Sequence, residues 1–63
     1  MKREDILELM NLKDWTPADL AARLGISTRS IDRYLAEEAR PHRNTVRAFA
    51  RLLDQARKHR GAA

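Results

Sequence analysis

The 63-residue sequence is long enough for one small domain, carries a net charge of +4 and contains no cysteine. A chain of this size is near the lower limit for folding without a metal or a disulfide. The lack of cysteine excludes disulfide scaffolds, thiolate zinc sites and cysteine nucleophiles. No apolar run approaches the length of a membrane span, and the opening MKREDILELM lacks the features of a signal peptide. We therefore expect a soluble cytoplasmic protein with no membrane partner.

The charges are unevenly distributed along the chain. Residues 1–22 hold three basic and five acidic side chains, a net charge of −2. Residues 23–63 hold ten basic and four acidic side chains, a net charge of +6. A basic half on a small domain favours a polyanionic partner, but a solvated arginine-rich surface has the same composition.

The first two predicted helices differ in how clearly they begin. One is expected over about residues 3–12, with apolar residues at helical spacing and acidic residues in the first turn. The other is expected over about residues 17–24. Thr16 is suited to the N-cap, Pro17 to the first helical position, and Asp19 to the third position of a capping box. Gly25 then supplies a left-handed turn that ends this helix.

A third helix is predicted over about residues 28–37, with Ser27 as its N-cap. Pro41 marks the break after it. A fourth helix is expected to begin near residues 42–44, where His42 is more readily a cap or a surface residue than a metal ligand. No segment alternates with a period of two, so the fold class is all-α. We expect one domain over residues 1–58 and a flexible tail over 59–63.

The spacing around Gly25 is typical of two helices that meet at a tight corner. Ala21 is small enough to let a second helix cross close to it, and Gly25 tolerates positive φ. Ile26, Ile31 and Tyr34 supply the apolar inner face of the following helix. These features together predict a helix-turn-helix.

The stretch WTPADLAARLGISTRSIDRYL resembles the helix-turn-helix of lambda-repressor/Cro-like (Xre-type) DNA-binding domains. ILEL and RPHRNTVRAFARLL are similar to the first and fourth helices of that family, so the resemblance covers roughly residues 4–53. It implies a compact four-helix lambda-repressor-like bundle whose third helix enters the major groove of double-stranded DNA. In a bacterium, such a protein would be associated with the nucleoid.

The sequence departs from the family pattern at several positions. Pro17 stands where a Gln often opens the second helix, and an apolar pair, Met10 and Leu35, stands where an ion pair is common. Glu37 and Glu38 occupy the place where a Gly commonly ends the recognition helix, which leaves the end of that helix open. The first half of the chain also resembles winged-helix and AraC-type regulators. These families are less favoured because no sequence typical of a β-wing follows.

The outward side of the third helix carries the candidate base contacts: Thr28, Arg29, Asp32 and Arg33. An Arg can donate two hydrogen bonds to guanine, worth about 1–3 kcal/mol of discrimination. Thr28 suits a thymine methyl or a phosphate, and Asp32 is expected to orient an Arg rather than to accept from cytosine. The alternative is a solvated face with an Arg29–Asp32 pair, worth a few tenths of a kcal/mol.

The expected phosphate contacts come from helix starts and from the connection between the third and fourth helices. They are Thr16, Ser27, Ser30, Arg40, Arg43 and Asn44. The three aromatic residues occupy core-type positions, which argues against a single-strand binder.

Other functions are weaker interpretations of the sequence. No arrangement of residues predicts an enzyme, a metal site, a cofactor or a small-molecule substrate. The main rival is a protein-interaction module that docks through Leu7, Leu12, Leu52 or the basic face. Family members usually bind DNA as dimers, yet no dimer helix follows the fourth helix, so a homodimer on DNA stays open. The sequence also leaves open whether the chain is a natural transcriptional regulator or an engineered DNA-binding domain.

Overall fold

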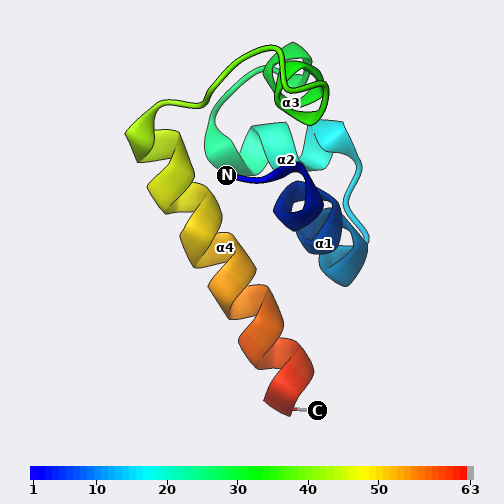
Figure 1. Ribbon diagram of the computed structural model, residues 1–63. Coiled ribbons are helices and arrows are strands. Elements are labelled where there is room, and N and C mark those ends of the chain that lie inside the picture. Colours follow the sequence, from blue (N-terminus) through cyan, green and yellow to red (C-terminus); the bar gives the residue numbers. More distant parts are fainter. Residues whose placement is uncertain (63) are drawn as a thin grey trace.

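The computed structural model describes residues 1–62 and the side chains of residues 1–59. This part of the chain contains four helices and no strand: α1 (Arg3–Lys13), α2 (Pro17–Leu24), α3 (Thr28–Leu35) and α4 (Arg43–Ala62). Helices α2 and α3 pack against each other, while the long α4 lies along α1 and also contacts α2 (Figure 1). The predicted all-α fold is confirmed.

One hydrophobic core joins all four helices. Its buried residues are Ile6, Leu9, Leu20, Ala21, Ile31, Phe49, Leu53 and Ala56. Burying a Leu or Ile side chain stabilises a fold by about 1.5–3 kcal/mol, so these contacts fix the arrangement of the helices. Ala21 is 2 % exposed, as expected for the small residue at the corner between α2 and α3. Trp15 and Tyr34 are only partly buried at the edge of this core.

The start of α2 is a complete capping box. The Thr16 hydroxyl accepts a hydrogen bond from the Asp19 N–H at 3.2 Å, and the Asp19 carboxylate accepts one from the Thr16 N–H at 2.9 Å. Pro17 follows at the first helical position, where no N–H is needed. The predicted start of α2 is therefore confirmed at the level of individual hydrogen bonds.

The end of α2 places Gly25 in the left-handed region, with φ of 69°. The Ile26 N–H donates to the Ala21 carbonyl at 3.0 Å, and the Gly25 N–H donates to the Ala22 carbonyl at 3.3 Å, which is the Schellman pattern. A Cβ at Gly25 would meet no atom within 4 Å. Positive φ, rather than lack of space, is what favours glycine here.

Helix α3 ends earlier than the sequence predicted. Its last helical residue is Leu35, and Glu37 is left-handed with φ of 60°. The Glu38 N–H donates to the Arg33 carbonyl at 2.9 Å, and the Glu37 N–H donates to the Tyr34 carbonyl at 3.1 Å. The sequence left this end open near residue 37; in the structure a Schellman turn closes the helix at Leu35 although no glycine marks it.

Helices α1 and α4 also differ slightly from the predicted boundaries. Helix α1 continues to Lys13 and ends at a left-handed Asp14. His42 caps α4, since its ring Nδ1 accepts from the Asn44 N–H at 3.1 Å. Helix α4 continues through Ala62, so residues 59–62 of the expected tail are helical, and residue 63 lies outside the described residues. No proline interrupts the helical sequence after Pro41.

Candidate nucleic-acid interface

The four candidate base-contacting residues lie on the exposed side of α3. Thr28, Arg29, Asp32 and Arg33 are all exposed, whereas Ile31 is fully buried on the opposite side of the helix. Because residues four apart lie one above another on a helix, Arg29 and Arg33 project from the same face, as do Thr28 and Asp32. Helix α3 therefore presents two adjacent arginines while its inner side holds it to the core.

Within the described side chains, neither arginine forms an ion pair. The Arg29–Asp32 pair considered from the sequence is accordingly not formed in this structure, and Asp32 makes no contact that would orient Arg33. The guanidinium groups keep their full set of donors available on the surface. A guanidinium in this condition can offer two parallel N–H groups to the edge of a guanine.

The start of α3 combines a side-chain cap with free backbone donors. The Ser27 hydroxyl accepts from the Ser30 N–H at 3.2 Å, and the two serine hydroxyls are 3.0 Å apart. The amides of Thr28 and Arg29 in the first turn have no intrahelical partner, and such amides attract anions. Ser27 is thus a confirmed cap, and its place beside these amides also suits a phosphate.

The other expected phosphate contacts lie at the starts of α2 and α4. Thr16 is exposed, although its hydroxyl already takes part in the capping box. Arg40, Arg43 and Asn44 are exposed in the connection after α3 and in the first turn of α4. The expected phosphate contacts are thus distributed over three separate helix starts and the connection before α4.

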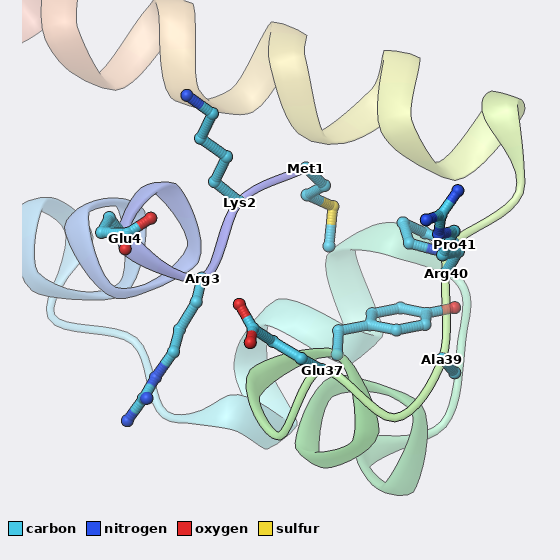
Figure 2. A pocket seen from close by; sticks show the side chains of 9 residues that line it. Met1, Lys2, Arg3, Glu4, Glu37, Ala39, Arg40 and Pro41 are labelled. Atoms are coloured by element: carbon cyan, nitrogen blue, oxygen red, sulfur yellow. The ribbon is translucent and has the colours of Figure 1, made fainter.

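A hollow of about 480 Å³ separates the N-terminal segment from the turn after α3 (Figure 2). Residues 1–4 line one side, and Tyr34, Glu37 and Arg40 line the other. Basic and acidic side chains alternate around it, because Lys2, Arg3 and Arg40 are accompanied by Glu4 and Glu37. The hollow therefore carries no single sign of charge that would select an anion.

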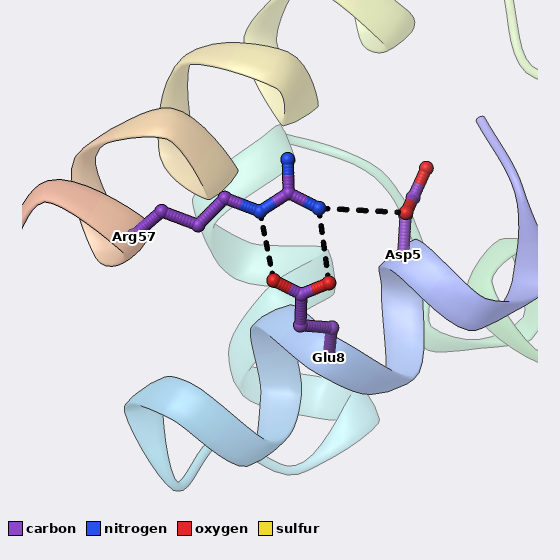
Figure 3. Close-up of polar contacts among 3 residues, drawn as sticks. All are labelled: Asp5, Glu8 and Arg57. Atoms are coloured by element: carbon purple, nitrogen blue, oxygen red, sulfur yellow. Dashed lines mark hydrogen bonds and ion pairs between the residues drawn. The ribbon is translucent and has the colours of Figure 1, made fainter. Parts of the chain in front are cut away.

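Two basic residues of α4 are committed to contacts within the protein. Arg57 donates from Nε to Glu8 Oε2 at 2.8 Å and from Nη2 to Glu8 Oε1 at 2.9 Å, and it lies 3.8 Å from Asp5 (Figure 3). The hydrogen bond with Glu8 raises the pKa of Arg57 above its ordinary value. Lys58 pairs with Asp54 at 3.1 Å.

The Arg57–Glu8 pair was not predicted from the sequence, because the partners are 49 residues apart and neither lies in a recognisable motif. The contact between Arg23 and Trp15, whose ring centroid lies 5.2 Å from the guanidinium carbon, was not predicted either. Trp15 precedes α2 and Arg23 lies in its last turn, and a basic residue eight positions after an aromatic one is a weak signal. Both contacts remove an arginine from the set available to a ligand.

The apolar residues proposed for the rival docking surface are mostly covered. Leu7 is 46 % exposed and is the one large hydrophobic side chain classed as exposed within the described residues. Leu12 and Leu52 are partly buried and pack against the core, as do Met10 and Leu35. No helix in the described part of the chain is long and apolar enough to cross a membrane. The same residues contain no cluster of side chains suited to a metal ion.

The chain is similar to a known protein family over nearly all of its four helices. A model of a helix-turn-helix family matches residues 6–60, from the first turn of α1 to the last turns of α4. No curated protein and no solved structure matches the chain. The matched region contains every candidate contact described above.

Proposed function

Because this chain belongs to the lambda-repressor-like helix-turn-helix family of DNA-binding domains, we propose that it reads a specific sequence in double-stranded DNA. Helix α3 enters the major groove, and Arg29 and Arg33 contact base edges there. Thr28 meets a thymine methyl or a phosphate, and Asp32 orients an arginine once the bases are engaged.

The observation that carries this proposal is the two-sided character of α3. Ile31 is fully buried, so the helix is held firmly to the core, whereas Arg29 and Arg33 are exposed on the other side. Neither arginine is engaged in an ion pair among the described side chains. A rigid helix with unpaired guanidinium groups meets the geometric demand of base readout, since the donors need no rearrangement within the protein.

Phosphate contacts fix the position of α3 in the groove. Ser27 and Ser30 lie beside the free amides at the start of α3, and Thr16 lies at the start of α2. Arg40, Arg43 and Asn44 continue this set after α3. Contacts of this kind set orientation and affinity but carry no sequence information.

The partial burial of Leu12 and Leu52 against the core supports the DNA-binding function over the protein-interaction module, because it leaves Leu7 as the large hydrophobic residue that is exposed within the described residues. We infer a cytoplasmic or nucleoid-associated protein that regulates transcription. Two copies bind adjacent half-sites if the target is palindromic.

Selection from a random duplex library, followed by a salt titration on the enriched sequence, tests the proposal. We expect enrichment of a short motif and a log–log slope of affinity against salt of about −0.9 for each phosphate neutralised. A library that remains random at moderate salt would contradict sequence-specific binding. Weak binding without preference for any sequence is the result expected of a protein-interaction module.

A further inference from the structure

Helix α4 carries a row of basic residues of which the proposed function uses only Arg43. Arg43, Arg47 and Arg51 recur every four residues and are all exposed. This spacing places them along one side of the helix, opposite the buried Phe49 and Leu53. We call the three residues the α4 basic stripe.

The residues of the α4 basic stripe form no ion pair within the described side chains, in contrast to Arg57 and Lys58 farther along α4. Asp54 follows Arg51 by three residues, but its carboxylate pairs with Lys58 at 3.1 Å. Like charges four residues apart destabilise a helix by a few tenths of a kcal/mol per pair, and the stripe contains two such pairs. Arg43 places a positive charge at the N-terminal end of α4, where the helix dipole is also positive. No acidic residue in the first turn offsets this charge. An anionic partner would relieve both repulsions.

The direction of α4 separates the stripe from the duplex that α3 reads. Helix α4 begins near the end of the α3 turn and leads away from α3 toward the C-terminus (Figure 1). Each four-residue step moves the stripe about 6 Å along α4, so Arg51 lies roughly 12 Å beyond Arg43. Arg43 is the first residue of α4 and lies next to the connection that follows α3, whereas Arg47 and Arg51 lie farther along the helix from that connection.

We propose that Arg47 and Arg51 bind the phosphate backbone of a second duplex segment, so that the domain bridges two stretches of DNA. The inference rests on the proposed function, because it takes duplex DNA as the ligand. A row of exposed arginines without aromatic or apolar neighbours on the same side matches the regular charge of a phosphate backbone. Its continuity with Arg43, an expected phosphate contact of the first duplex, favours DNA over an acidic protein. The second segment is bound without regard to its sequence.

A bridging assay with the full chain tests the inference. A duplex carrying the selected site is immobilised, and capture of a labelled duplex of unrelated sequence is measured with and without the protein. We expect the wild type to capture the labelled duplex. The double variant Arg47→Gln/Arg51→Gln should lower capture about tenfold and reduce the salt slope of capture by roughly 1.8, the value for two phosphate contacts. Its affinity for the selected duplex alone should be unchanged.

The double variant Lys2→Gln/Lys13→Gln removes the same charge from the opposite end of the chain and should leave capture unchanged. Circular dichroism establishes that both double variants are folded. Three results would overturn the inference: no capture by a wild type that binds its selected site, undiminished capture by Arg47→Gln/Arg51→Gln, or an equal loss of affinity for the selected duplex alone. A wild type that selects no sequence would instead overturn the proposed function, so the two failures are distinguishable.

Discussion

The turn before α3 and the turn after it use the same backbone device with different residues. Both end a helix with a Schellman pair of hydrogen bonds around a left-handed residue. Before α3 that residue is Gly25, with φ of 69°; after α3 it is Glu37, with φ of 60°. Glycine adopts this conformation without steric penalty, whereas for other residues it costs about 1–2 kcal/mol. The first turn is therefore relaxed and the second is strained.

This difference indicates that the two turns serve different demands. The turn at Gly25 fixes the angle between α2 and α3, where Ala21 and Ile31 are both buried. The turn at Glu37 lies beside the mixed-charge hollow and leads into the exposed Arg40. Left-handed strain is not confined to that turn, because Asp14 also adopts positive φ, of 57°, at the end of α1. The turn at Glu37 connects the candidate base contacts of α3 with the expected phosphate contacts Arg40 and Arg43.

The largest change in stability is expected when the first turn is given a residue that is strained at positive φ, as Glu37 is in the second turn. Gly25→Val should lower the free energy of unfolding by about 2 kcal/mol, because a β-branched residue resists positive φ. Since an added Cβ meets no neighbouring atom, the loss reports on the backbone alone. Thermal unfolding measures it, with Ala22→Val as the control for a branched residue on the exposed side of α2. An unchanged Tm for Gly25→Val would mean that positive φ at this turn has no energetic importance.

A smaller loss is expected from the cap that follows the first turn. Ser27→Ala removes the side-chain acceptor of the Ser30 N–H, which keeps its hydrogen bond to the Ser27 carbonyl at 3.0 Å, and should cost about 1 kcal/mol of stability. Ser30→Ala keeps that backbone bond and loses only the hydroxyl contact, so its unfolding free energy should fall by less. Chemical denaturation of the two variants compares them directly. Equal losses would show that the hydroxyl pair, rather than the cap, stabilises the start of α3.

The smallest expected effect has the opposite sign. Glu37→Gly should raise the free energy of unfolding by roughly 0.5–1 kcal/mol, because relief of left-handed strain exceeds the added entropy of the unfolded chain. Glu38→Gly removes the same charge at a residue with ordinary φ and is the matched control. That control should be neutral or destabilising. A Tm that rises equally in both variants would attribute the gain to charge instead of backbone strain.

The sequence predicted the first turn and missed the second for a physical reason. Thr16, Pro17, Asp19 and Gly25 each satisfy a local backbone requirement, so their order alone indicates where α2 begins and ends. Glu37 carries no such signal, since Glu is a good helix former that rarely adopts positive φ. The end of α3 depends on backbone hydrogen bonds that residue type does not specify.

The candidate site shows a similar division. The exposed side of α3 follows from its helical spacing, because Ile31 faces the core and Arg29 and Arg33 must then face outward. Which basic residues are already engaged could not be predicted, since Arg57 meets Glu8 only after α1 and α4 have packed together. The contacts with bases and phosphates stay predictions.

The most direct test of the account compares Arg29→Ala, Arg33→Ala and Arg43→Ala on the selected duplex and on a scrambled one. Either α3 variant should lose about 1–3 kcal/mol of binding free energy on the selected site and blur the preference at one or two base pairs. Arg43→Ala should weaken binding to both duplexes alike and make the salt slope shallower by about 0.9. If both α3 variants lose affinity equally on the two duplexes, α3 contacts only the DNA backbone and is not the recognition helix.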